Sequence, residues 1–140
     1  MTTITSSATA RTDSTPAFWR PAAIAVVAAA AATTLVAAVA HAAGVSLVMS
    51  GEPIPATGFG TLTLIFGTLG LGIAAAIRRW ANRPRQAFVR TTIALTAASL
   101  IPDLVVSVSL ATRLTLMATH LVAAAIVIPV VAARLARERS

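Results

Sequence analysis

The sequence has no cysteine, no lysine and no tyrosine, and it has only four acidic residues among its 140. Without cysteine the chain cannot form disulfides, carry out thiol redox chemistry or hold zinc or an iron–sulfur cluster through thiolates. Charged residues amount to 11%, whereas a soluble domain carries about 25%. This charge is too little to cover a water-facing surface, which excludes an ordinary soluble domain.

Hydrophobic residues make up 57% of the chain, and the mean hydropathy is +0.86. The formal net charge of +7 also occurs in nucleic-acid-binding proteins. Here, however, the arginines lie at the ends of apolar segments, where they set membrane topology, and not along one face of a soluble helix. We therefore expect the lipid bilayer as the surrounding medium and no nucleic acid as a partner.

Four apolar segments follow one another, at about residues 22–43, 58–77, 88–110 and 112–133. Each has the roughly 20 residues that a helix needs to cross a hydrocarbon layer of about 30 Å. No segment alternates apolar and polar residues as a barrel strand would. The sequence predicts an all-α membrane protein, a bundle of four transmembrane helices.

The domain organisation is simple. Residues 1–19 are rich in threonine, serine and alanine, and they predict a disordered cytoplasmic tail. Residues 20–135 form the transmembrane domain, and residues 136–140 form a short cytoplasmic tail. One alternative is that Ala40-His41-Ala42 is a signal-peptidase site. Cleavage there would leave three spans and an external N-terminus, but the apolar run is longer than the usual 7–15 residues.

The arginines set the expected orientation. Two lie near the N-terminus, four in the connection after the second segment, and three at the C-terminus. The first connection has none, and the last turn has only Arg113. By the positive-inside rule both termini lie in the cytoplasm. The alanine-rich, lysine-free composition is typical of a bacterium, so we expect the bacterial inner membrane.

Asp103 is the most informative polar residue, because an ionisable group inside a membrane is costly and marks a functional site by default. A polar stripe with helical spacing runs through it: Thr92, Thr96, Ser99, Asp103 and Ser107. His120 lies in the fourth segment. With a turn near Ala111 and Thr112, both Asp103 and His120 lie roughly 13 Å below that turn. We expect the two to be able to form a hydrogen-bonded pair.

His41, Glu52 and Arg113 fall in the same outer half of the predicted bundle. This one-sided distribution predicts a modest pocket that opens outward. Its expected ligand-binding residues are His41, Ser99, Asp103, Ser107 and His120. The catalytic candidates, if there is catalysis, are Asp103, His120 and Glu52. A structural interpretation is also open, in which Asp103 and His120 only fix helix packing and Glu52 is a solvated loop residue.

Helix packing explains the second segment. Thr63, Gly67, Gly70 and Ala74 form a small-residue face that allows another helix to approach closely, and the alanine-rich first segment is the expected partner. Four short helices bury little surface, so a homodimer or a partner membrane protein is plausible. The sequence has no H-E-x-x-H, G-x-S-x-G or Walker motif. We expect neither a cofactor nor a metal.

Three functions remain open. The leading one is non-enzymatic, either binding a lipophilic small molecule or supporting a partner membrane protein. The second is proton-coupled transport through Asp103 and His120. The third is a membrane-embedded acid–base enzyme, an isomerase, cyclase or epoxide-opening enzyme acting on a lipophilic substrate.

Three stretches resemble an uncharacterised family of small four-span actinobacterial membrane proteins, known as a domain of unknown function. They are Gly44-Val45-Ser46-Leu47, the arginine-rich connection, and Met117-Ala118-Thr119-His120-Leu121-Val122 running to Ile128-Pro129. The similarity covers roughly residues 20–135. It implies the four-span architecture and draws attention to His120, and it carries no known activity or catalytic residue.

Overall fold

Long helices account for nearly all of the chain. The computed structural model describes residues 15–49 and 51–137. These form α1 (Thr15–Ala42), β1 (Val48–Met49), β2 (Glu52–Pro53), α2 (Ala56–Trp80), α3 (Pro84–Val105) and α4 (Leu110–Arg137). Each helix is long and apolar enough to cross a membrane. The expected architecture of four apolar helices is confirmed.

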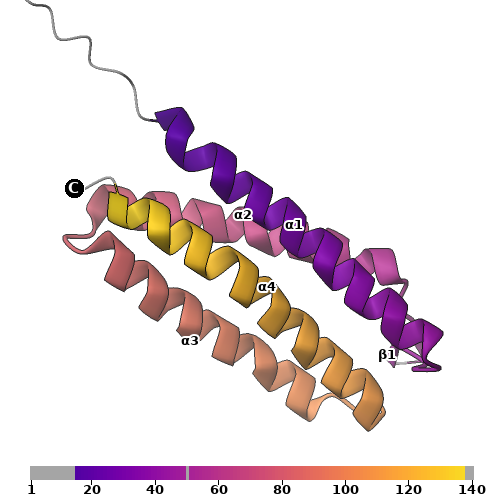
Figure 1. Cartoon of the computed structure of the whole chain (residues 1–140). Helices are drawn as coiled ribbons and strands as arrows, with labels where there is room; N and C mark the ends of the chain where they lie inside the picture. The colour runs from indigo at the N-terminus through magenta and orange to yellow at the C-terminus, as the bar shows by residue number, and fades with distance from the viewer. Residues whose placement is uncertain (1–14, 50, 138–140) are drawn as a thin grey trace, which may run out of the picture.

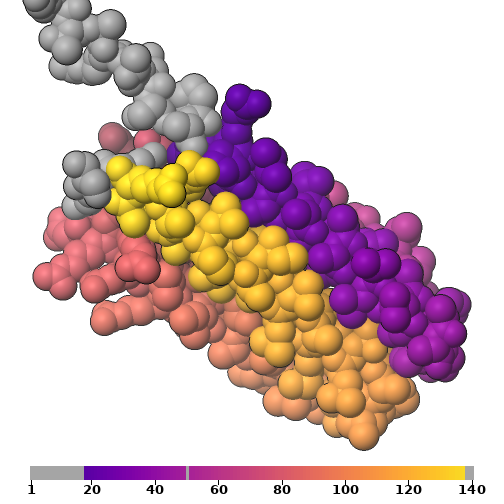
Figure 2. Space-filling view, viewed as in Figure 1, coloured from indigo at the N-terminus to yellow at the C-terminus, as the bar shows by residue number. Residues whose placement is uncertain are grey.

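The helices pack so that α1 lies against both α2 and α4, while α3 packs on the far side of α4 (Figure 1). Figure 2 shows α1 and α4 side by side along one face of the molecule. The start of α1, the α2–α3 connection and the end of α4 meet at one end, which we call the arginine end. The β1–β2 hairpin and the α3–α4 connection lie at the other, which we call the hairpin end.

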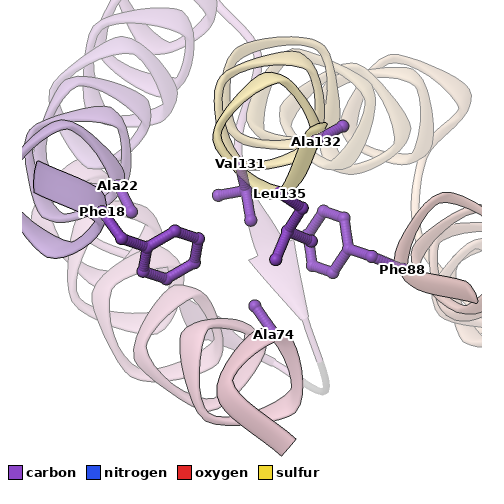
Figure 3. Packing of buried hydrophobic residues seen from close by; sticks show 7 residues of the cluster. All are labelled: Phe18, Ala22, Ala74, Phe88, Val131, Ala132 and Leu135. Atoms are coloured by element: carbon purple, nitrogen blue, oxygen red, sulfur yellow. The ribbon is translucent and has the colours of Figure 1, made fainter. Parts of the chain in front are cut away.

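All four helices contribute to an apolar cluster at the arginine end. Figure 3 shows Phe18 of α1, Ala74 of α2, Phe88 of α3 and Leu135 of α4 pointing toward one another. Each of these side chains is at most 1% exposed. The guanidinium carbon of Arg78 lies 5.2 Å from the centre of the Phe18 ring, a cation–π contact. This end of the bundle is therefore closed by apolar packing.

The hairpin end has a smaller cluster. Leu47 and Phe59 pack with Ala37 where α1 turns back toward α2. The turn needs positive φ at Gly44 (87°), a conformation that glycine adopts without steric cost. Gly51, with φ of 86°, turns the chain between β1 and β2. Gly51, Pro53 and Pro55 in the sequence predict an irregular loop here, whereas the structure has these two short strands.

Large apolar side chains cover much of the outer surface of the bundle. Exposed examples occur on every helix: Ile24, Val27, Leu35, Leu62, Phe66, Leu69, Ile93, Ile101, Leu104, Leu114 and Leu121. A soluble monomer rarely exposes so continuous an apolar surface. The surface is typical of helices that face lipid, and it is compatible with a membrane protein.

The helix ends differ from the expected ranges. Residues 15–19, expected in the tail, form the beginning of α1, and residues 136–137 belong to α4. The rest of the expected tails, residues 1–14 and 138–140, lies outside the described residues. A further difference is at α3, which ends at Val105 and not near residue 110.

Two local features explain the early end of α3. Pro102 lacks the N–H that would bond to the carbonyl oxygen of Ala98, which weakens this part of the helix, and α3 ends three residues later. Ser109 then begins α4, because its Oγ accepts a hydrogen bond from the backbone N–H of Thr112 at 3.1 Å. A serine in this position is a favourable N-cap. The expected turn at Ala111 is therefore wrong, and the connection spans residues 106–109.

Candidate functional site

Asp103 and His120 lie together at the interface of α3 and α4. The Nδ1 atom of His120 is 2.9 Å from Oδ2 of Asp103. Asp103 is buried, with 10% of its side chain exposed, whereas 39% of the His120 side chain is exposed. The structure thus brings together the two residues that the sequence analysis singled out. One partner is enclosed and the other is half open to the surroundings.

The contact has ion-pair distance but lacks hydrogen-bond geometry. Nδ1 of His120 is also 2.9 Å from the carbonyl oxygen of Leu116, one turn earlier, and this contact does have hydrogen-bond geometry. The Oδ2 atom of Asp103 is buried without a hydrogen-bond partner. Because a carbonyl oxygen only accepts, the Leu116 contact assigns the proton to Nδ1. In the neutral ring, Nε2 is then a hydrogen-bond acceptor.

The pair forms even though the turn is not where the sequence analysis expected it. His120 lies ten residues into α4, about 15 Å from the start of that helix. Asp103 is in the last turn of α3. The four residues of the non-helical segment 106–109 can span up to about 13 Å when extended. An α-helix would need about nine residues to cover the same distance. This segment compensates for the early end of α3 and lets Asp103 reach the depth of His120.

The rest of the expected polar stripe divides into two groups. Thr92 and Ser99 are half-buried on α3, and each donates a hydrogen bond to a carbonyl of its own helix. Ser107 lies beyond the end of α3 and is exposed. Its assignment to the helical stripe is wrong, because the spacing argument assumed that the helix continued to residue 110.

A second polar face, on α4, was not predicted. Thr112, Thr115 and Thr119 are all less than 9% exposed. Thr115 and Thr119 donate to carbonyls of their own helix, at 2.9 and 2.7 Å, while Thr112 pairs with Ser109 at the helix start. These threonines are three and four residues apart in the sequence, and this helical spacing would have predicted that they share one face of α4. Because their hydroxyls are satisfied locally, they contribute packing and no open site.

Arg113 stabilises the α3–α4 connection. Its Nη2 donates a hydrogen bond to the carbonyl oxygen of Val106 at 3.2 Å, and its Nε is buried without a partner. The side chain therefore ties the start of α4 to the end of α3.

His41 and Glu52 remain apart from the pair. His41 is exposed in the last turn of α1, and Glu52 is exposed in β2. Neither forms a hydrogen bond or an ion pair with Asp103 or His120. Within residues 15–49 and 51–137, no three histidine, aspartate or glutamate side chains come close enough to hold a metal ion.

Two open depressions, each of about 260 Å³, lie at the arginine end of the described bundle. One is lined by Arg85, Gln86, Val89 and Arg90. The other lies between the start of α3 and the end of α4. Neither involves His41, Ser99, Asp103, Ser107 or His120. The outward pocket at these residues stays a prediction.

The small-residue face of α2 meets α1 as expected at two of its positions. The hydroxyls of Thr63 and Thr33 are 2.9 Å apart, and a Cβ atom on Gly67 would come within 2.6 Å of Val26. A Cβ atom on Gly70 would meet nothing within 4 Å, so Gly70 is not a close-approach point. Ala74 is fully buried in the four-helix cluster.

Gly60 is the close-approach residue that the sequence analysis missed. A Cβ atom there would collide with the hydroxyl of Thr34 and lie 3.2 Å from the carbonyl oxygen of Ala30. Only glycine allows this approach of the two helices.

A family model described as a family of unknown function (DUF6069) matches residues 13–137. The chain belongs to this family. The matched range contains all four helices and both residues of the Asp103–His120 pair. No curated protein and no solved structure matches the chain significantly. Membership in DUF6069 supports the family resemblance seen in the sequence and assigns no activity.

Proposed function

We propose that this DUF6069 protein is a multi-pass protein of the bacterial inner membrane with both termini in the cytoplasm. The support is the distribution of charge along four apolar helices. Eight of the described arginines lie at or near the arginine end: Arg20, Arg78, Arg79, Arg83, Arg85, Arg90, Arg134 and Arg137. The hairpin end has Arg113. Such an excess of arginine favours the cytoplasmic side.

The depth of the pair follows from α4. Arg113 and Arg134 are separated by 21 residues, or about 32 Å of helix, which is close to the thickness of a bilayer core of about 30 Å. His120 lies seven residues from Arg113, about 10 Å into the span. In this placement the pair is surrounded by hydrocarbon and protein, where a polar atom without a partner is costly.

The function that this geometry supports best is binding without catalysis, at the exposed edge of His120. The observation that carries it is that Nδ1 is engaged within the chain while 39% of the side chain stays exposed. Nε2 forms no hydrogen bond with a described residue. A lipophilic molecule with a hydroxyl or N–H group would satisfy this nitrogen. A donor on a partner membrane protein would do the same.

The test is to purify the protein with its bound molecules and identify them by mass spectrometry. Wild-type protein is compared with His120→Leu, and with His41→Leu as a control for the loss of an exposed histidine. We expect a lipophilic molecule or a partner protein to be retained by the wild type and the control and lost from His120→Leu. Equal retention by all three proteins would refute a binding role for His120.

A second candidate, proton-coupled transport, is favoured by one observation. A carboxyl group and an imidazole lie 2.9 Å apart within the proposed span, and such pairs occur in membrane proton relays. Protein in liposomes would then dissipate an imposed proton gradient when substrate is present, and Asp103→Asn would abolish this while the fold persists. Liposomes that hold the gradient with every substrate class offered would exclude this candidate.

A further inference from the structure

The two depressions at the arginine end adjoin one another, and they share Arg85 and Gln86. The first follows one face of the beginning of α3, from Arg85 to Arg90. The second is formed by residues 82–86 together with Leu135 and Ala136 of α4. Because the two depressions share Arg85 and Gln86, we consider them together as one surface, which we call the α3–α4 groove.

Three exposed arginines line the α3–α4 groove: Arg83, Arg85 and Arg90. None of the three guanidinium groups has a hydrogen bond or an ion pair with a described residue. The acidic residues in the described part of the chain are Glu52 and Asp103, and both lie toward the hairpin end. The groove is thus strongly cationic, with no carboxylate of the described bundle to neutralise it.

The remainder of the lining is mixed. Asn82 and Gln86 are polar, whereas Val89 in the first depression and Ala136 in the second are apolar and accessible. Ile93, one helical turn beyond Val89, is 58% exposed on α3. A cationic groove at the level of the headgroups therefore continues into an apolar surface that would face the acyl chains. A free inorganic anion uses only the first of these two features, whereas a phospholipid uses both.

We propose that the α3–α4 groove binds the phosphate of an anionic phospholipid of the cytoplasmic leaflet, with Arg83, Arg85 and Arg90 around the phosphate. Guanidinium groups suit phosphate because their planar N–H donors bind two oxygens at once. Basic pockets between helices on the cytoplasmic side are a known way of holding anionic headgroups. This inference uses the membrane orientation proposed above and does not depend on the role of His120.

The test compares two triple variants with the same loss of charge. The first removes the arginines of the groove, in Arg83→Gln/Arg85→Gln/Arg90→Gln. The matched control removes three exposed arginines of the same end that line neither depression, in Arg20→Gln/Arg79→Gln/Arg137→Gln. Binding of phosphatidylglycerol, cardiolipin and phosphatidylcholine to each purified protein is measured by native mass spectrometry and by titration in detergent micelles.

We expect the wild type to retain phosphatidylglycerol or cardiolipin in preference to phosphatidylcholine. A hydrogen bond to a charged group contributes about tenfold in affinity. The groove triple removes the arginines that bind the phosphate directly and is therefore expected to lose roughly 100-fold or more. The control triple, whose arginines lie outside the groove, is expected to lose at least about ten times less. An excess of inorganic phosphate is expected not to displace the lipid, because the apolar contacts remain.

Three results would overturn the proposal. Equal losses in the two triple variants would mean that only the overall charge attracts anionic lipid. Equal retention of phosphatidylcholine would mean that the groove does not recognise the anionic headgroup. Displacement by inorganic phosphate would make free phosphate, and not a phospholipid, the ligand. Cysteine labelling of position 82 in each variant separates these results from a change in membrane orientation, which would instead contradict the proposed topology.

Discussion

Two helix pairs in this bundle recognise each other by different means. The α1–α2 pair is held by close approach, since Gly60 and Gly67 leave room for Ala30 and Val26 and a single Thr33–Thr63 hydrogen bond crosses the interface. The α3–α4 pair has a carboxyl group against an imidazole. Within lipid there is little hydrophobic drive for association, so shape and polar contacts must supply the specificity.

The difference shows which of the two interfaces has polar atoms without a hydrogen-bond partner. The hydroxyls between α1 and α2 are satisfied, because Thr33 and Thr63 lie within hydrogen-bond distance of each other and each also lies within hydrogen-bond distance of a carbonyl oxygen of its own helix. Between α3 and α4, Oδ2 of Asp103 has no hydrogen bond, and His120 keeps an exposed edge. The first interface is complete within one chain, and the second is open to an additional partner.

The largest effect is expected at the α3–α4 pair. His120→Leu leaves Asp103 buried without its imidazole, and because His120 itself is partly exposed, we expect a destabilisation of up to about 3 kcal/mol, the lower end of the range for a fully buried pair. The free energy of unfolding in mixed micelles measures this. Asp103→Leu/His120→Leu is expected to recover most of the loss, because no uncompensated group remains. A double variant as unstable as His120→Leu would mean that the two side chains are not coupled.

The next largest change in the free energy of unfolding is expected at the α1–α2 pair. Alanine substitution is expected to lower this free energy at one glycine and to raise it at another. Gly67→Ala forces Val26 away and is expected to destabilise by about 1–3 kcal/mol. Gly70→Ala meets open space, and it is expected to stabilise by up to about 1 kcal/mol through helix propensity. The same unfolding assay compares the two. Equal effects would show that α2 does not meet α1 at Gly67.

The smallest effect is expected at the single hydrogen bond across α1 and α2. Thr63→Val removes its contact with Thr33 and is expected to cost about 0.6 kcal/mol, a typical value between membrane helices. The matched control is Thr61→Val, because the exposed Thr61 hydroxyl bonds only to its own helix. A control that costs as much as Thr63→Val would assign the effect to loss of the hydroxyl and not to the interface.

Much of the architecture followed from hydropathy alone. Runs of about 20 apolar residues specify spanning helices almost independently of their neighbours, and all four are present. The meeting of Asp103 and His120 also followed, because adjacent antiparallel helices place residues of similar depth side by side. Packing at Gly67 followed from helical periodicity.

The errors arise where local backbone chemistry overrides hydropathy. Val106 and Val108 are apolar, so hydropathy extended α3 through them, but Pro102 and the cap at Ser109 end it earlier. Gly70 lies on the correct face of α2, but contact depends on the side chain opposite, which the pattern of one helix does not contain. Gly60 was missed for the same reason, since its role depends on how α1 and α2 align.

Cysteine labelling in intact cells tests the central claim most directly, because the chain has no cysteine of its own. Single cysteines are introduced at Ser46, by the hairpin end, and at Asn82, in the α2–α3 connection; both positions are exposed. A membrane-impermeant maleimide is expected to label Ser46→Cys in spheroplasts and to label Asn82→Cys only after lysis. Labelling of both positions from the same side would contradict a bundle that spans the membrane, and the reverse pattern would contradict its orientation.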